Sequence, residues 1–170
     1  GSASGEGNVI SGNVVNSNEG GAIVDRGANG VIQGNYIGVG ADGTTAVPND
    51  GYGIYHAGTE NSIIGGSSVG EANIIANNGA QGVLVNSGSA SIIGNSIYDN
   101  TELGIDIGLV GVTPNDLLDS DVGANDLLNY PEMLPPIESG GDTFVSYQLD
   151  VPAADYRVEI FENTAYDPSG

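Results

Sequence analysis

Short apolar runs, separated by glycine and asparagine, recur along the first 107 residues of the chain in two series. Within each run the isoleucines and valines occupy alternate positions, which is the period of a β-strand. One series comprises residues 10–13, 32–35, 75–78 and 92–95, each beginning with isoleucine and ending with asparagine. The other comprises 21–24, 53–56, 82–85 and 104–107, each beginning with glycine. This repetition predicts one structural unit that is used four times.

The repeat has the length of one turn of a parallel β-solenoid. Ile32 follows Ile10 by 22 residues, and Gly104 follows Gly82 by the same interval. The other intervals are longer, as expected where loops are inserted. Stacked coils would place equivalent side chains at the strand separation of about 4.8 Å, where stiff β-branched residues pack well. We therefore expect an all-β fold, with a parallel β-helix of about four coils over residues 1–107.

Asparagine follows glycine, or another asparagine, at the predicted corners, where a positive φ is inexpensive for these two residues. We expect Asn13, Asn35, Asn78 and Asn95 to stack as one internal ladder, in which each amide bonds the next. Alternatively, each asparagine merely tolerates its turn. Both interpretations are structural.

The coil rhythm ends in residues 108–136, which form an acidic connector rich in Asp, Asn and Pro. Oxygen-bearing side chains cluster here, as a hard cation such as calcium requires. The predicted ligands are Asp119, Asp121, Asn125 and Asp126. The spacing lacks the glycine and glutamate of an EF-hand loop. The alternative is an Asp-rich turn whose side chains cap their own backbone.

Alternating apolar residues return in the last segment, 137–170, after Pro135-Pro136. One run covers residues 145–151 and another covers 156–160, with the chain turning at 152–155. This pattern predicts a β-hairpin, which by itself is marginal in water.

Three motifs resemble those of the right-handed parallel β-helix repeat proteins of bacterial and archaeal surfaces. They are Gly-Asn-Tyr-Ile-Gly at 34–38 with Ala-Asp-Gly-Thr at 41–44, the segment 65–75, and Leu-Gly-Ile-Asp-Ile-Gly at 103–108. Residues 111–116 resemble the segment that closes such helices. The resemblance implies right-handed coils, in agreement with the general crossover preference, and a C-terminal β-sandwich. It is specific for fold and not for function, because the fold hosts lyases, hydrolases, adhesins and stalks.

Both predicted modules are incomplete. Residues 1–10 are echoed by residues 66–75, so the chain begins inside a coil and should expose an unpaired strand edge. The final hairpin is only part of a sandwich. Either the chain is a fragment of a larger surface protein, or neighbouring copies complete it in a head-to-tail assembly.

The charge is strongly acidic, with 22 Asp and Glu against 2 Lys and Arg, for a formal net charge of −20. Such a field repels nucleic acid and polyanionic glycans and favours cations. No apolar run has the length of a membrane span. Cysteine is absent, which excludes disulfides and thiolate metal sites.

Catalytic residues are hard to find in this chain. Proton abstraction by lysine is excluded, and the two basic residues are Arg26 and Arg157. A carboxylate pair could in principle hydrolyse a glycoside, and the candidates in the coils are Asp25, Asp42, Asp50 and Asp106. Alternation places Asp106 on an outer strand face. His56, the single histidine, aligns with Val24, Val85 and Ile107 at an inward position, as a core residue.

The function expected from these features is a non-catalytic structural module outside the cell, as a stalk, an adhesin element or a self-assembling filament subunit. Its partners would then be copies of itself or adjoining domains of a surface protein. The alternative is a carbohydrate-active or carbohydrate-binding β-helix, in which Tyr36 and Tyr98 stack against a neutral polysaccharide.

Overall fold

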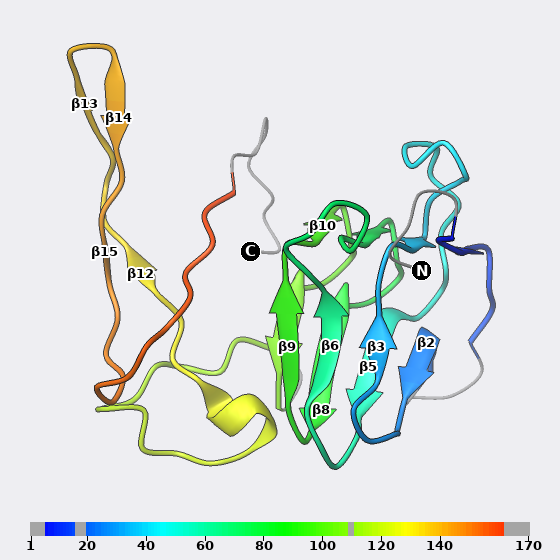
Figure 1. The fold of residues 1–170 in the computed structure, drawn as a ribbon, viewed down its shortest axis with the longest axis horizontal. Coiled ribbons are helices and arrows are strands. Elements are labelled where there is room, and N and C mark those ends of the chain that lie inside the picture. Colours follow the sequence, from blue (N-terminus) through cyan, green and yellow to red (C-terminus); the bar gives the residue numbers. More distant parts are fainter. Residues whose placement is uncertain (1–5, 16–19, 109–110, 162–170) are drawn as a thin grey trace.

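The structure is a computed structural model, and it describes residues 6–15, 20–108 and 111–161. Its main body is a parallel β-helix made of three sheets (Figure 1). Sheet A contains β1 (Val9–Ile10), β4 (Tyr36–Ile37), β7 (Ile74–Ala76) and β10 (Ser96–Tyr98). Sheet B contains β2 (Gly21–Asp25), β5 (Tyr52–Ala57), β8 (Val83–Ser87) and β11 (Ile105–Ile107). Sheet C contains β3 (Val31–Ile32), β6 (Ser62–Gly65) and β9 (Ala90–Ile93). This architecture confirms the predicted fold class.

Each sheet contributes a row of stacked apolar side chains to the core, and sheet B adds Val85 and Ile107 from a second row. The central members Ile37, Ile54 and Ile64 are fully buried, one from each sheet. The rows follow the strand register, as Ile10, Ile37, Ile75 and Ile97 in sheet A, Ile23, Ile54, Val83 and Ile105 in sheet B, and Ile32, Ile64 and Ile92 in sheet C. β-Branched side chains suit these flat rows because a single χ1 rotamer repeats from coil to coil.

The first sequence series proves to combine two different corners. Ile10 and Ile75 belong to sheet A, whereas Ile32 and Ile92 belong to sheet C. Each coil has two corners at which an asparagine closely follows an apolar strand, so the local sequence does not distinguish them. The last three members of the second series are in register as predicted, with Ile54, Val83 and Ile105 side by side in sheet B. The first member is shifted by one residue, because Ile23 rather than Ala22 pairs with Ile54.

The structure contains two asparagine ladders, so the prediction of one ladder was wrong. Asn35 and Asn95 belong to the first, and Asn13 and Asn78 to the second. The first ladder runs through Asn8, Asn35, Asn73 and Asn95. The second runs through Asn13, Asn49, Asn78 and Asn100. Each ladder therefore has one asparagine from every coil, at side-chain N···O distances of 2.8–3.0 Å.

Glycine is required at the end of β6 for two independent reasons. Gly65 has a φ of +83°, and a Cβ placed on it would lie 2.2 Å from the carbonyl oxygen of Ile93 in the next coil. Coils that stack this closely leave no space for a side chain at that corner.

The C-terminal segment forms a small antiparallel module, as predicted, but from other strands than the two predicted runs. β13 (Ile137–Ser139) pairs with β14 (Asp142–Phe144), and β12 (Glu132–Met133) pairs with β15 (Tyr147–Gln148). The turn lies at Gly140-Gly141, both at positive φ, and the β13–β14 hairpin projects away from the coils (Figure 1). Residues 156–160 are not in a strand, so the prediction that they pair with 145–151 was wrong. A Gly-Gly turn forms the hairpin earlier in the chain than alternation alone suggested.

Candidate metal centre

Three aspartates come together in the segment that follows the last coil. Asp116, Asp119 and Asp121 each offer a carboxylate oxygen, and these oxygens lie within 4.8 Å of one another. All three residues are partly buried. Several carboxylate oxygens at such separations are what a hard cation such as calcium or magnesium uses. The cluster is therefore able to hold a metal ion.

Local turns position the three carboxylates. Leu118 and Asp119 adopt left-handed φ values of 59° and 53°, which fold the chain back on itself within a few residues. Ser120 donates its backbone N–H and its hydroxyl to the carboxylate of Asp116, at 3.0 Å and 2.6 Å. These bonds hold the pKa of Asp116 below its ordinary value, because they stabilise the ionised form.

Asn129 fixes the loop from the other side. Its buried side chain accepts from the Asp116 N–H at 2.9 Å and donates to the Asp116 carbonyl at 2.8 Å. The backbone N–H of Asn129 donates to Asp119 at 2.6 Å. In Asp121, Oδ1 is buried and has no hydrogen-bond partner among the described residues. A cation at the cluster would provide the positive charge that this oxygen lacks.

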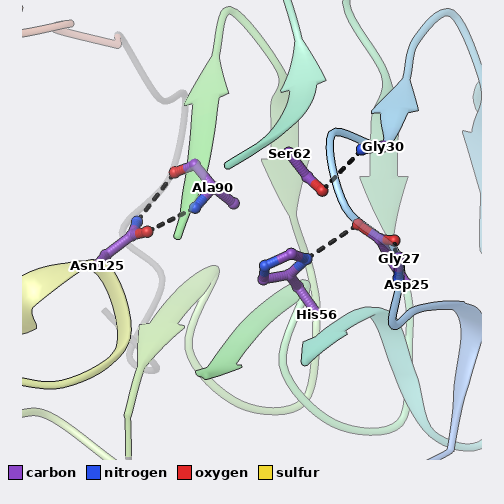
Figure 2. A network of polar contacts seen from close by, with 7 residues as sticks. All are labelled: Asp25, Gly27, Gly30, His56, Ser62, Ala90 and Asn125. Carbon is purple, nitrogen blue, oxygen red and sulfur yellow. Dashed lines mark hydrogen bonds and ion pairs between the residues drawn. The ribbon is translucent and has the colours of Figure 1, made fainter. Parts of the chain in front are cut away.

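The clustered aspartates coincide only in part with the metal ligands predicted from sequence. Asp119 and Asp121 are in the cluster, Asp116 was missed, and Asp126 is outside it. Asn125 is engaged elsewhere, because its side chain binds both the N–H and the carbonyl of Ala90, at 2.6 Å and 3.0 Å (Figure 2). The spacing in sequence gives no sign of the left-handed turn at residues 118–119, which is what carries Asp116 to its partners.

We call residues 111–129 the cap, because this segment covers the C-terminal end of sheet C. The cap contains the short 3₁₀ turn η1 (Ala124–Leu127), which contacts β8 and β11. In this turn, the side chain of Asn125 accepts from the Ala90 N–H at the open edge of β9, where a further strand would otherwise pair. The backbone N–H of Asn125 donates to the carbonyl of Gly88 at 2.8 Å. Beside it, Glu159 accepts from the N–H of Gly94 at 2.8 Å and pairs with Arg157 at 2.6 Å. The candidate metal centre thus lies in a segment that is docked on the coils.

A second polar cluster lies inside the coils, around His56. This histidine is fully buried as predicted, but its neighbour in the register is Asp25 rather than Val24. The two side chains meet at 2.9 Å between His56 Nδ1 and Asp25 Oδ2 (Figure 2). Burial would by itself raise the pKa of Asp25, but hydrogen bonds from Ser62, His56 and the Gly27 N–H outweigh it and lower that pKa.

This arrangement is not a catalytic triad. Asp25 lies between His56 and Ser62, whereas a nucleophile must contact the histidine. The second ring nitrogen of His56, Nε2, is buried without a hydrogen-bond partner among the described residues. The cluster joins the first coil to the second.

The other candidate carboxylates also bind groups of their own chain. Asp42 accepts from the N–H groups of Thr44 and Thr45 at 3.0 Å and 2.9 Å, and Asp50 accepts from the N–H of Val15. Asp106, which alternation placed on an outer strand face, is only 3% exposed. It shares a row with Leu84 and is covered because Gln81 and the Gly111 N–H both donate to it at 2.9 Å.

The two tyrosines proposed as glycan contacts lie on the outer side of sheet A. The turn around Gly43 folds over them. A Cβ on Gly43 would lie 3.5 Å from Tyr36 Cε1, and the Tyr98 hydroxyl donates to the Gly43 carbonyl at 3.4 Å. Both rings are partly buried. They support this turn in the structure, and their role in glycan binding stays a prediction.

A comparison of the chain with known protein families, with curated proteins and with solved structures found no match. Among the described residues, no helix is both long and apolar enough to span a membrane.

Proposed function

We propose that the protein is a non-catalytic structural module of an extracellular or cell-surface protein, acting as a stalk or adhesin element. The observation that supports this role most is the continuity of the two asparagine ladders through all four coils. Buried polar networks with satisfied partners rigidify a structure, and in solenoids each coil is stabilised by its neighbours. A stack of this kind bears load along its length.

We further propose that the ion bound at Asp116, Asp119 and Asp121 is calcium. Carboxylate oxygens favour hard cations over soft ones, and the flexible coordination of calcium tolerates an irregular loop better than magnesium does. The net charge of −20 attracts divalent cations to the surface. Bound calcium would hold the cap rigid through Asn129 and so stabilise its contact with β9.

Calorimetric titration of the full chain with calcium tests this site. We expect one saturable site that is lost in Asp121→Asn. Asp126→Asn is the matched control, because it removes the same charge from the same segment but lies outside the cluster. Equal affinities in the two variants, or no saturable heat with the unmodified chain, would show that calcium is attracted only by the general acidic field.

The structural role is tested in the organism that produces the protein. Antibodies against the chain should label intact cells, and deletion should change the surface layer or cell adhesion. The purified protein should release no product from neutral or acidic polysaccharides. Catalytic turnover that disappears in Asp25→Asn or Asp106→Asn would contradict the proposal.

A further inference from the structure

We infer that the N-terminal face of the stack is a docking surface for another β-solenoid coil that carries asparagine at both corners. The face is formed by β1, β2 and β3, which are the outermost strands of their sheets. Its biological setting rests on the proposed structural role, whereas the surface follows from hydrogen bonding and burial.

Both ladders run in the same direction. In the first, Asn8 donates its backbone N–H and its Nδ2 to Oδ1 of Asn35, at 3.2 Å and 2.9 Å. Asn35 repeats both bonds to Asn73, at 2.9 Å and 3.0 Å. In the second ladder, Asn13 makes the same pair of bonds to Asn49, at 3.1 Å and 2.8 Å. Along each ladder, the Oδ1 of one asparagine thus accepts from the asparagine of the preceding coil. The Nδ2 groups of the later asparagines also donate back to a backbone carbonyl of the preceding coil, as Asn49 does to Ile10 and Asn73 does to Ile32.

The ladders therefore end in acceptors at the N-terminal face. Asn8 and Asn13 are exposed, and their Oδ1 atoms receive no hydrogen bond from the residues in 6–15, 20–108 and 111–161. Each of these oxygens occupies the position at which Asn35 and Asn49 accept two N–H groups. The complementary partner is a coil that presents an asparagine, with its backbone N–H and Nδ2, at each of the two corners.

The apolar layer at the same face is incompletely covered. Ile10, Ile23 and Ile32 are only partly buried, whereas their successors Ile37, Ile54 and Ile64 are 0% exposed. A further coil would bury this layer in the way that the second coil is buried. It would also pair the backbone groups that edge strands leave open.

Two copies meeting by their N-terminal faces would not continue the ladders. The backbone N–H and Nδ2 pair that the Oδ1 atoms of Asn8 and Asn13 lack is already bonded to Asn35 and Asn49 in each copy. The cap argues against a second copy docking by its C-terminal face. The side chain of Asn125 already hydrogen-bonds to the N–H and the carbonyl of Ala90 on β9, and Glu159 accepts from the N–H of Gly94. These groups are therefore not open to another strand. The occupant that fits is therefore a solenoid coil whose C-terminal face is free.

An inserted coil tests the inference. Residues 73–94 contain β7, β8 and β9 and one asparagine of each ladder, Asn73 and Asn78, and Asn95 follows them in the first ladder. A duplicate of residues 73–94 is placed between Gly7 and Asn8. We expect amide hydrogen exchange at residues 9–10, 23–24 and 31–32 to slow by about tenfold. The matched control carries the same insertion with both copied asparagines changed to alanine, and should show a smaller gain.

Unchanged exchange at these residues, or equal gains with and without the two asparagines, would overturn the inference. Protection of residues 74–76 and 83–85 reports that the host coils stay folded in each variant. Sedimentation velocity of the unmodified chain should show a monomer. Self-association that is lost in Asn8→Ala with Asn13→Ala would identify the occupant as a second copy and overturn the role given to the cap. None of these outcomes bears on cell-surface labelling, so failure of the docking surface is distinguishable from failure of the structural role.

Discussion

At the scale of single residues, acidic side chains of the coils stabilise turns and corners. Asp42 accepts hydrogen bonds from the Thr45 hydroxyl and from the backbone N–H groups of Thr45 and Thr44, which lower its pKa from 3.8 to about 2. Burial alone would raise the pKa of Asp25, but hydrogen bonds from Ser62, His56 and the Gly27 N–H lower it. A carboxylate whose pKa is lower in the folded state stabilises the fold above its unfolded pKa, and this stabilisation is lost as the pH falls through the folded pKa.

We expect Asp42→Asn to lower the urea midpoint at pH 7, since the amide is a weaker acceptor for three donors. The difference from the unmodified protein should shrink between pH 4 and pH 2, because Asp42 itself then becomes protonated. Urea unfolding of both proteins at pH 7, 4 and 2 measures this difference in midpoint. Asp142→Asn, at the start of β14, is the control for the loss of charge. A difference that is constant over this range would show that the carboxylate is not the stabilising group.

The Asp25–His56 contact predicts a second effect of this kind. Asp25→Asn should destabilise the protein at pH 7, and the loss should be largest in the first coil, which β2 joins to β5 through this contact. The effect should diminish as the pH falls below 3.8, the ordinary pKa of Asp25. Amide exchange resolved by residue, at pH 7 and at the lowest pH where the fold persists, checks both points. Uniform destabilisation of all coils would contradict a local contact.

At the scale of elements, the sequence pattern predicts the strands and coils well, but it predicts poorly which corners and side chains lie next to one another. Alternating isoleucines and corner glycines indicated the β-helix, because burial on a flat sheet imposes period 2. The pattern did not separate the two corners, so four ladder members were missed, namely Asn8, Asn49, Asn73 and Asn100. The cap could not be predicted either, because its left-handed turns place Asp116 and Asn125 through backbone geometry that no residue type imposes.

The ladders predict that the cost of losing an asparagine depends on its place in the stack. Asn73 is fully buried and bonds Asn35, Asn95 and the Ile32 carbonyl, so Asn73→Ala should cost about 3 kcal/mol of unfolding free energy. Asn13 is exposed and bonds one neighbour, so Asn13→Ala should cost about 1 kcal/mol or less. Urea unfolding of both variants measures the difference. Equal costs would mean that the ladder is not a buried network.

At the scale of the whole molecule, we expect the four coils to behave as one stiff unit that is closed at one end by the cap. The coils share one apolar core and two continuous ladders, whereas the β13–β14 hairpin makes little contact with them (Figure 1). Solenoids in which each unit contacts only its neighbours can unfold in parts when the coupling between neighbours is weak. Strong coupling through the ladders would make the coils open together.

Amide hydrogen exchange of the native chain, followed by NMR at increasing urea, measures whether the coils open together. We predict that the most protected amides of β4, β5, β7, β8 and β10 converge on a single opening free energy, while amides of the β13–β14 hairpin exchange far faster. Separate opening free energies for successive coils would show that the ladders do not couple them, and would contradict a stiff structural unit.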